Sequence, residues 1–406
     1  MATLVEPAAR PGGAGLREPV LEIDGLNIVY DTEEGPLNTV RDVSLTVRRG
    51  ESLGLVGESG SGKSTLVMGA IGYLAANGHV SSGSVRLLGE EIARRTPSSM
   101  QPLWGSRIAV VYQNPLSALN PSIRIGKQLA EVARLHLGMD AHRARHLTLE
   151  MLTKVAMPDP ENIFERYPHQ VSGGMLQRCV IAMALMARPA LLIMDEPTTA
   201  LDVTTQAVVL DLVAELKGDI DSAIVYITHD LGVVARICDH IAVMYAGEIM
   251  EKSPLRQTFT ESLHPYTRSL LSCVPRFDVS CTKQPLPFIP GHIPRANELP
   301  GGCIFEPRCQ FAEEACRTAR PALRQVAPER WTACRRWGVL PSWDRSCLDA
   351  LAAAESQSSI RDGDRLIDAV DIAKHYSAAE GGLRLRRRDR RVVHALDATS
   401  LWIGRG

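Results

Sequence analysis

The sequence predicts an α/β fold in which strands alternate with helices, and three features carry this prediction. The apolar run "SLGLVG" leads directly into the glycine-rich stretch "GESGSGKST" at 57–65, and "KSTLVMGAIGYL" then has a helical pattern. Two further apolar runs, "ALLIMDEP" and "SAIVYITHD", flank the helix-forming segment "TTQAVVLDLVAELKG". Apolar runs separated by a helix are typical of buried parallel strands.

Other segments before residue 255 extend this domain. Residues 20–56 alternate as strands do, and short strands return between 85 and 125. Residues 126–190 have mostly helical periodicity. The composition changes at about 255 to a Pro-rich, aromatic and Cys-bearing segment, which predicts a separate small module over 256–340.

Length and charge exclude several classes of protein. The 406 residues suffice for two domains, and 45 basic against 46 acidic residues give a net charge of -1, which draws the chain neither to nucleic acid nor to an anionic membrane. Residues 1–19 lack the apolar core of a signal peptide and predict a disordered tail. The longest apolar stretch, 179–194, is interrupted by Arg188 and Pro189 and is shorter than the roughly 20 residues of a membrane span. We therefore expect a cytoplasmic chain.

The glycine-rich stretch fits the phosphate-binding pattern G-x-x-x-x-G-K-[ST]. Its glycines let backbone N–H groups surround phosphates, Lys63 reaches the β- and γ-oxygens, and Ser64 is placed to bind Mg²⁺. The alternative is a glycine turn that caps a helix. The candidate nucleotide-binding residues of this stretch are Gly57, Glu58, Ser59, Gly60, Ser61, Gly62, Lys63, Ser64 and Thr65.

Two further strand ends carry groups that suit phosphate chemistry. Asp195 and Glu196 end the run "LLIMDEP", where Asp195 can hold Mg²⁺ and Glu196 can orient and deprotonate a water molecule. His229 ends the next run, "ITHD", where it can sense the γ-phosphate. The plainer interpretations are a strand-end turn for the acidic pair and a solvated or core residue for the histidine.

A third group of motifs completes an order of elements. In "YPHQVSGGMLQRCVIAMAL", Ser172, Gly173 and Gly174 open a helix whose free N–H groups can bind an anion, although alone this is only a helix cap. "VVYQNPLSALNP" contains Gln113, "TTALD" contains Asp202, and the aromatic Tyr30 lies upstream of all of them. With these motifs, residues 20–255 resemble the nucleotide-binding subunit of ATP-binding cassette (ABC) transporters.

The resemblance implies a P-loop NTPase fold of the ABC type, with an antiparallel β portion and a helical portion, that binds ATP and Mg²⁺. It implies that Tyr30 stacks on adenine and that Gln113 links the Mg²⁺ site to a membrane partner. Residues Ser172 to Gly174 would complete the ATP site of another subunit, and Asp202 would lie at that interface. In this sequence the signature reads "VSGGM", so Val171 and Met175 depart from the commoner form.

The methionine and the strings "YPHQ", "LNPSIRIGKQL", "HPYTRSLL" and "GHIPRANELPGGCIFEPRC" resemble the peptide-importer branch. This implies an ATPase that powers uptake of di- or oligopeptides with two transmembrane permease subunits and a second ABC ATPase subunit or domain, arranged head to tail. An extracytoplasmic peptide-binding protein would act indirectly, and the chain would sit peripherally on the cytoplasmic face of the cell membrane. The alternatives are import of nickel or glutathione, and a soluble ABC ATPase without a transport role.

Four cysteines crowd into the C-terminal module. Cys303, Cys309, Cys316 and Cys334 have the spacing C-x5-C-x6-C-x17-C, which resembles the extension of oligopeptide and dipeptide importer ATPases and implies a [4Fe-4S] cluster. Zinc or metal-free thiols are the alternatives. We expect this site to lie outside the nucleotide core, and we expect Cys179, Cys238 and Cys273 to be ordinary apolar residues.

After a linker predicted over 341–364, the sequence repeats itself. "LIDAVDIAKHY" aligns with "VLEIDGLNIVY" at 20–30, and "SLWIGRG" aligns with "SLTVRRG" at 44–50. We expect 365–406 to be the truncated start of a second ABC domain, either in a fragment of a two-cassette chain or in a product that borrows a separate cassette. The arginine-rich run 384–391 falls in a ten-residue insertion between the repeated strands and predicts a solvated loop rather than a nucleic-acid or lipid site.

Overall fold

The computed structural model describes residues 18–199, 201–219, 221–274, 288–341, 365–378 and 391–404. The chain divides into two compact units, 1–276 with 285–344 and 277–284 with 345–406, and each is described here by itself. Nearly all of the predicted tail, linker and arginine-rich loop lies outside the described residues.

The first unit is built on an eight-stranded sheet with the order β11-β12-β10-β9-β3-β8-β7-β6. Five neighbouring strands, from β9 to β6, are parallel, and every residue of β3 and β8 is buried. The prediction of buried parallel strands at 190–197 and 222–230 is therefore confirmed. The bounds are β3 (Ser52–Val56), β6 (Ile108–Val111), β7 (Leu191–Asp195), β8 (Ala223–Thr228), β9 (His240–Tyr245), β10 (Glu248–Pro254), β11 (Arg324–Ala327) and β12 (Arg330–Thr332).

A second, antiparallel sheet of the order β2-β1-β4-β5 confirms the expected antiparallel portion. Alternate residues of its long strands, such as Ile28, Val40 and Val85, are fully buried in one core cluster with residues of β3 and α1. The bounds are β1 (Pro19–Thr32), β2 (Gly35–Arg48), β4 (Gly78–Leu87) and β5 (Glu90–Glu91).

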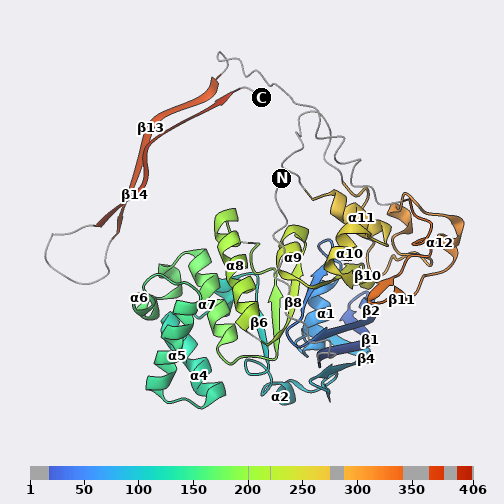
Figure 1. Ribbon diagram of the computed structural model, residues 1–406, viewed down its shortest axis with the longest axis horizontal. Coiled ribbons are helices and arrows are strands. Elements are labelled where there is room, and N and C mark those ends of the chain that lie inside the picture. The colour runs from blue at the N-terminus through green and yellow to red at the C-terminus, as the bar shows by residue number, and fades with distance from the viewer. Residues whose placement is uncertain are drawn as a thin grey trace. The chain divides into compact units, whose positions relative to one another are not determined.

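The helices cover the large sheet and form the expected helical portion, in which α4 to α7 are grouped together (Figure 1). Gly138 ends α4 in a left-handed conformation, and the Asp140 side chain caps α5 by accepting from the Arg143 N–H. The bounds are α1 (Lys63–Ala70), α2 (Pro97–Met100), α3 (Pro115–Ala118), α4 (Ile125–Leu137), α5 (Ala141–Lys154), α6 (Pro160–Glu165), α7 (Gly173–Leu185), α8 (Val203–Asp219), α9 (Leu231–Ile237), α10 (Leu255–Thr260), α11 (Pro265–Ser272), α12 (Glu314–Thr318), and the 3-10 turns η1 (Pro168–Gln170) and η2 (Glu306–Arg308).

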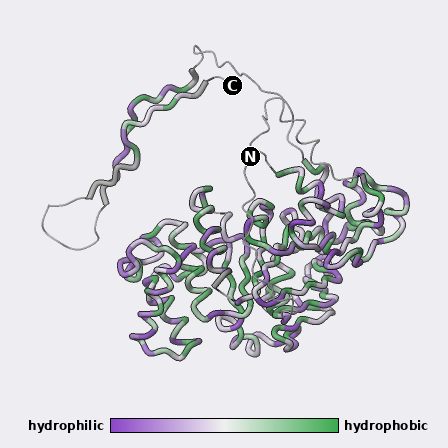
Figure 2. The backbone as a smooth tube through the Cα atoms, viewed as in Figure 1, coloured by the Kyte–Doolittle hydropathy of each residue, from purple (hydrophilic) through white to green (hydrophobic). Residues whose placement is uncertain are grey.

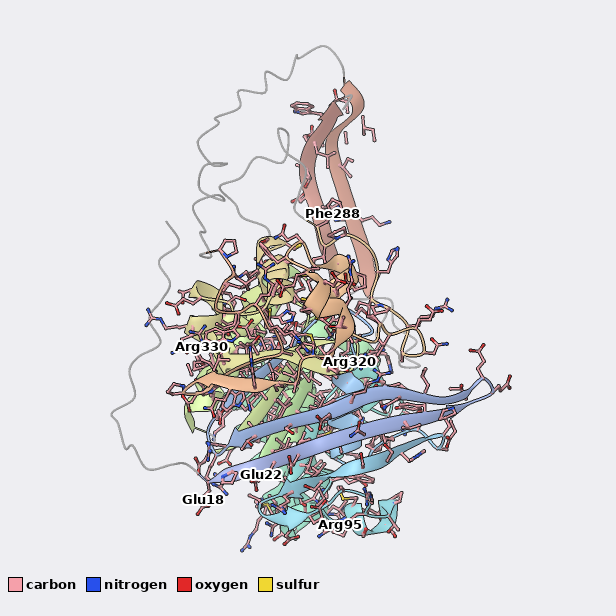
Figure 3. All side chains as sticks on the ribbon, turned by 90° about the vertical axis from the view of Figure 1, so that its right-hand side faces the viewer. Glu18, Glu22, Arg95, Phe288, Arg320 and Arg330 are labelled. Carbon is pink, nitrogen blue, oxygen red and sulfur yellow. The ribbon has the colours of Figure 1, made fainter. Side chains whose placement is uncertain are left out.

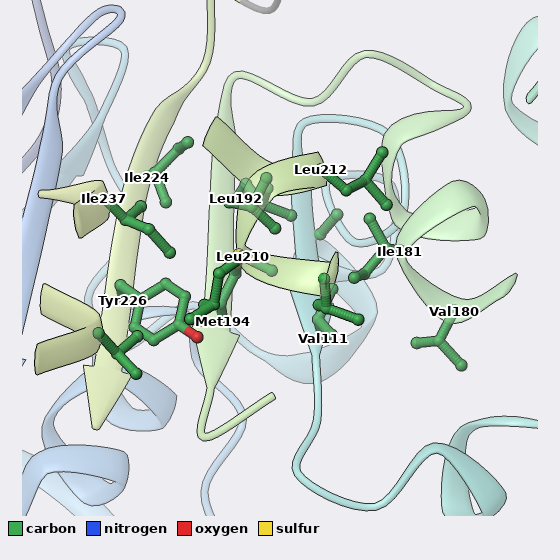
Figure 4. Packing of buried hydrophobic residues seen from close by; sticks show 14 of the residues in the cluster. Val111, Val180, Ile181, Leu192, Met194, Leu210, Leu212, Ile224, Tyr226 and Ile237 are labelled. Carbon is green, nitrogen blue, oxygen red and sulfur yellow. The ribbon is translucent and has the colours of Figure 1, made fainter. Parts of the chain in front are cut away.

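The main core lies between the sheet and the helices α7, α8 and α9 (Figure 4). Leu192, Met194 and Tyr226 on the strands pack with Ile181 of α7 and Leu210 of α8, and all five are at most 5% exposed. Burying one such side chain contributes about 1.5–3 kcal/mol. This packing fixes the carboxyl ends of β7 and β8, where the predicted site residues lie.

The Cys-bearing segment does not form a separate module. Strand β12 pairs with β10 and so continues the large sheet, while Ile304, Phe305 and Ala333 belong to the main core. The whole described part of this segment also falls in the first compact unit. The prediction of a separate module over 256–340 is therefore not confirmed.

The described part of the second unit is a hairpin of β13 (Arg365–Ala378) with β14 (Arg391–Gly404), which confirms strands on both sides of the predicted insertion. Each pairing in this hairpin matches a β1–β2 pairing, so that Leu26↔Val43 becomes Ile372↔Thr399. The repeat therefore extends from the sequence to the backbone.

The match includes irregular features of the hairpin. The Asp371 N–H donates to Ser400 Oγ at 3.0 Å, as the Gly25 N–H donates to Ser44 Oγ at 2.9 Å. Hydrophobic residues recur along both strands (Figure 2), and Ile372 and Leu401, which correspond to the buried Leu26 and Leu45, are 41% and 49% exposed. The hairpin thus presents apolar side chains that the equivalent strands of the first unit bury.

Candidate functional site

The glycine-rich stretch connects β3 to α1, as its pattern predicts. At Gly57 an added Cβ would lie 2.1 Å from the carbonyl oxygen of Met244, so this position requires glycine. Gly62, in a left-handed conformation at φ 99°, is the N-cap of α1. At Gly57 the backbone therefore approaches its neighbour too closely for a side chain, as is common in loops that wrap around phosphates.

Lys63 is buried inside this loop. Its Nζ donates to the carbonyl oxygens of Gly57 at 2.8 Å and Glu58 at 3.0 Å. Burial lowers the pKa of Lys63, and the nearby carboxylates of Glu196 and Asp195 oppose that shift. The lysine thus places one partly desolvated positive charge within the loop.

Polar groups from separate segments converge beside this lysine. Ser64 Oγ donates to Asp195 Oδ1 at 3.0 Å, and burial raises the pKa of Asp195 against that hydrogen bond. The Glu196 carboxylate lies 3.1 Å from His229 Nδ1 and 3.4 Å from Gln113 Nε2. The structure therefore brings together five of the predicted residues, each at the end of a strand or at the start of α1.

Glu196 itself is held firmly. Thr199 Oγ1 also donates to its Oε2 at 3.1 Å, and its backbone N–H donates to the carbonyl of Ile227. Its φ of 47° is unusual for a residue other than glycine, and such conformations cluster at functional sites. A carboxylate fixed in this way, beside a histidine and a lysine, can accept a proton from a water molecule bound next to a phosphate.

A cavity of about 850 Å³ opens beside the loop and is lined by Ser59, Gly60, Gly62 and Thr65. Its other walls come from Thr32, Glu33, Glu34, Leu37 and Thr39 of the β1–β2 hairpin, from Ala246 and Gly247, and from residues 293–297 of the C-terminal segment. Arg41 holds that last wall by donating to the carbonyl of Ala296 at 2.8 Å.

The predicted adenine-stacking residue is not part of this lining. The Tyr30 ring lies on the backbone of Gly78, where an added Cβ would be 2.7 Å from the ring. Sequence reasoning also missed the wall formed by 293–297, because "GHIPRANELP" indicated only a branch of a family and no contact with the loop.

The signature residues form a second group around the start of α8. Ser172 caps α7 by accepting from the Met175 N–H at 3.4 Å, and an added Cβ at Gly174 would meet Thr205 Cγ2 at 2.1 Å. Asp202 accepts from the Thr205 N–H at 2.9 Å and from its hydroxyl at 2.6 Å. These hydrogen bonds from Thr205 lower the pKa of Asp202. Gly173 has open space around it, and neither Ser172 nor Asp202 lines the cavity beside the phosphate loop.

The four clustered cysteines line one pocket of about 20 Å³, together with His264, Phe305 and Phe311. Burial raises the pKa of Cys303 to about 11 and that of Cys334 to about 12. Within the described ranges, no three His, Cys, Asp or Glu side chains form a group suited to a single metal ion.

The three other cysteines singled out by the sequence lie elsewhere. Cys179 and Cys238 are buried in the main core, as expected of ordinary apolar residues, and Cys273 is half-buried.

The cysteine pocket is lined by residues between 264 and 336, outside the predicted nucleotide-binding domain at 20–255, but neighbouring residues connect it to the phosphate loop. Arg308, next to Cys309, pairs with the carboxylate of Glu58 in the glycine-rich loop at 3.0 Å. The Glu58 N–H donates to the Tyr266 hydroxyl at 3.0 Å. No local pattern signals these contacts, because Arg308 and Glu58 are 250 positions apart.

Comparisons with known proteins agree with this geometry. A family model described as "ABC transporter" matches residues 40–199, and one described as "Oligopeptide/dipeptide transporter, C-terminal region" matches residues 250–316. The chain is 46% identical to the oligopeptide transport ATP-binding protein OppD of Salmonella typhimurium (strain LT2), with 78% of this chain and 93% of that protein covered. It is 43% identical to OppD of Escherichia coli (strain K12), with 82% and 97% covered.

Solved structures show the same fold. A structure of cbiO1 from Clostridium perfringens, part of the ABC transporter complex cbiONQ, matches with a TM-score of 0.52 and 25% identity, over 60% of this chain and 92% of that chain. The dimeric ATP-binding cassette MJ0796 in a post-hydrolysis state, bound to ADP and Pi, matches with a TM-score of 0.52 and 25% identity, over 58% and 99%.

Across the part of the chain that the structure describes, no helix combines the length and apolarity that crossing a bilayer requires. One conclusion follows from the phosphate loop, the convergence of Asp195, Glu196 and His229, the two matching family models and the high identity to OppD proteins. The chain belongs to the ABC transporter ATP-binding proteins, in the oligopeptide and dipeptide transporter branch.

Proposed function

We propose that the chain is the ATP-hydrolysing subunit of an importer for di- and oligopeptides. The observation that carries the proposal is the convergence of Gln113 and His229 on Glu196, beside Lys63 and Ser64 of the phosphate loop. The cargo rests on the names of the relatives, which are oligopeptide transport proteins.

In this proposal the loop 57–65 binds the phosphates of ATP through its N–H groups, and Lys63 turns from the loop carbonyls to the β- and γ-oxygens. Glu196 orients the attacking water and takes its proton, while His229 contacts the γ-phosphate and steadies the carboxylate. Ser64, Asp195 and Gln113 would hold Mg²⁺, which supplies charge neutralisation of the phosphates when bound. The oxygen donors of Ser64 and Asp195, 3.0 Å apart, suit such a cation.

The signature residues serve a second nucleotide. Ser172, Gly173, Gly174 and Asp202 lie away from the cavity that the phosphate loop lines, and their helix presents free N–H groups at its start. We place them against the ATP of a second ABC ATPase subunit or domain in a head-to-tail dimer. The match to a cassette solved as a dimer supports this arrangement.

The remaining partners follow from the importer proposal. Two transmembrane permease subunits would bind the chain on the cytoplasmic face of the cell membrane. Gln113 would link the Mg²⁺ site to these membrane partners. An extracytoplasmic peptide-binding protein would deliver the cargo to the permeases. Adenine would be bound within the cavity, with Tyr30 stacked on it after its ring leaves Gly78.

The domain proposal assigns 20–255 to the nucleotide-binding domain, 256–340 to the importer-type C-terminal region and 365–406 to the start of a second ABC domain. Its support is the pairing-by-pairing match between the β13–β14 hairpin and the β1–β2 hairpin. The exposed apolar residues Ile372 and Leu401, at 41% and 49%, would be covered by the remainder of such a domain.

The four cysteines of the pocket are proposed to hold a [4Fe-4S] cluster. Cys303, Cys309, Cys316 and Cys334 line the same pocket, and thiolates are the usual ligands of iron–sulfur clusters. A pocket of about 20 Å³ has room for one water molecule, so the thiol side chains must change rotamer to admit a cluster. Because burial raises the pKa of Cys303 and Cys334, binding must also release protons.

Iron and sulfide analysis of protein purified without oxygen tests the cluster. We expect bound iron and sulfide with broad visible absorption, lost in Cys309→Ser and retained in the control Cys273→Ser, which lies outside the pocket. Colourless protein, with zinc or with no metal, would refute the cluster.

The ATPase assignment is tested with Glu196→Gln. We expect ATP hydrolysis to fall by about 10²–10⁴-fold while ATP still binds, because the carboxylate acts on water and the loop holds the phosphates. Glu150→Gln, an exposed carboxylate on α5, is the control. Hydrolysis by Glu196→Gln at the wild-type rate would contradict the assignment. Uptake of labelled peptide into vesicles that contain the permeases and binding protein tests the cargo.

A further inference from the structure

The C-terminal segment holds the phosphate loop from outside. Arg308 Nη1 donates to Glu58 Oε1 at 3.0 Å, and Nη2 donates to Oε2 at 3.1 Å. The Arg308 side chain is 5% exposed and that of Glu58 is 27% exposed, so the pair is partly shielded from water. A bidentate pair of this kind fixes the orientation of both partners. The second residue of the phosphate loop is therefore tied to a residue of η2.

The same arginine also fixes a wall of the cavity. Its Nε donates to the carbonyl of Pro290 at 2.8 Å, and Nη2 donates to that of Ile289 at 3.2 Å. These two residues begin the segment whose later part, 293–297, lines the cavity beside the loop. Arg308 thus orders two walls of the nucleotide site at once.

A tyrosine makes a second connection to Glu58. The Tyr266 hydroxyl accepts a hydrogen bond from the Glu58 N–H at 3.0 Å, and its ring is fully buried. That ring lies 4.7 Å from the ring of Tyr245 and 5.2 Å from that of Phe305, measured between centroids. The main chain and the side chain of Glu58 are therefore both held by residues outside the loop.

Both connections begin at the cysteine pocket. Arg308 directly precedes Cys309, and Phe305, which packs on Tyr266, lines the pocket with the four cysteines. His264 also lines it, and its Nδ1 accepts from the Tyr266 N–H at 3.1 Å. A displacement of the thiols can therefore be transmitted to Glu58 through a few residues in direct contact.

We propose that Arg308 and Tyr266 are positioning residues that hold the phosphate loop in the shape that receives ATP, and that they make ATP affinity depend on the state of the cysteine pocket. The inference rests on the proposed ATP site and is independent of the cargo. The hydrogen bonds of the Arg308 side chain and the Tyr266 hydroxyl go to residues other than Glu196, so we expect their effect on binding rather than on the chemical step.

Calorimetric measurement of ATP binding, made first on the wild type, tests whether Arg308 and Tyr266 position the phosphate loop. We expect Arg308→Gln to raise the Kd for ATP about tenfold, since it removes a bidentate charge-assisted pair, while kcat at saturating ATP changes less than about threefold. Arg330→Gln is the matched control, because Arg330 (labelled in Figure 3) is a 12%-exposed arginine that pairs with Glu261. Failure of the wild type to bind ATP would refute the site itself rather than the role of Arg308.

Further variants separate positioning from folding. Arg308→Lys, which keeps one donor and the charge, should recover part of the affinity, and Tyr266→Phe should lower affinity without loss of ring packing. The double variant Arg308→Gln with Glu58→Gln should cost less than the sum of the two single changes, because they break one interaction. Wild-type affinity in folded Arg308→Gln, or an equal loss in Arg330→Gln, would overturn the positioning role.

The dependence of ATP affinity on the cysteine pocket is tested with Cys309→Ser in two backgrounds. We expect this change to shift the Kd for ATP in the wild-type background and to have little further effect in the double variant Arg308→Gln with Tyr266→Phe, because both connections to Glu58 are then cut. Cys316→Ser, which lines the same pocket without being next to Arg308 in sequence, serves as a second probe. Equal shifts in both backgrounds, or no shift with either cysteine variant, would refute the coupling.

Discussion

Stability should fall in mild acid because of one buried histidine. His264 is 1% exposed, its Nδ1 accepts from the Tyr266 N–H, and its Nε2 has no hydrogen-bond partner among the described residues. Burial lowers the pKa of His264 to about 3, so the folded protein keeps this side chain neutral. In the unfolded chain the pKa of the same residue is about 6.5.

The sign and the size follow from proton linkage. A histidine whose pKa is depressed by folding contributes full stability above about pH 6.5, and this contribution is lost as the pH falls towards the folded-state pKa. Between pH 7.5 and pH 5 the unfolded state gains about 2 kcal/mol from protonation of this residue. The value hardly depends on the folded-state pKa while that remains well below 5.

Urea unfolding at pH 7.5 and pH 5 measures this effect. His264→Asn keeps an acceptor for the Tyr266 N–H and removes the titrating group, so its loss of stability between the two pH values should be about 2 kcal/mol smaller than that of the wild type. His142→Asn, at an exposed position of α5, is the control and should behave as the wild type. The same pH-dependent loss in His264→Asn and in the wild type would refute the reasoning.

Three other outcomes follow from the structure. Lys63→Ala should weaken ATP binding by about 10–100-fold in calorimetry, because it removes the positive charge of the phosphate loop, and unchanged binding would contradict that role. Gly57→Ala should lower the free energy of unfolding by at least about 2 kcal/mol, as its Cβ would meet the carbonyl of Met244 at 2.1 Å. Gly60→Ala, also at positive φ but in open space, should cost less. Limited proteolysis should remove everything after about 345 and leave the core intact, whereas a resistant C-terminal hairpin would show that the repeat has another role.

The parts that sequence predicted well are those with a local signal. The phosphate loop needs glycines at fixed positions, and the strand before Asp195 is a continuous apolar run, so both could be located from a short window. The convergence of Glu196 and His229 also followed, because carboxyl ends of parallel strands meet at one edge of a sheet. The hairpin at 365–404 was predicted because it repeats an earlier segment.

The missed features depend on contacts between distant segments. Strand β12 has only three residues, too few for a periodic pattern, so its pairing with β10 and the merging of the Cys-bearing segment with the main sheet could not be predicted. The Glu58–Arg308 pair joins two charged residues that each resemble an ordinary surface residue in sequence. The place of the Tyr30 ring on Gly78 depends on the register between β1 and β4, which no motif specifies.

The left-handed backbone at Glu196 decides how two adjacent carboxylates are used. Successive side chains of a strand face opposite sides of the sheet, so regular extension of β7 would send Asp195 and Glu196 apart. The left-handed conformation at Glu196 interrupts that alternation, and both carboxylates oppose the lowering of the Lys63 pKa by burial. Sequence neighbours thereby become spatial neighbours, and the proposed Mg²⁺ ligand and the proposed base occupy two consecutive positions. An insertion between them would separate the two carboxylates even if both residues were retained.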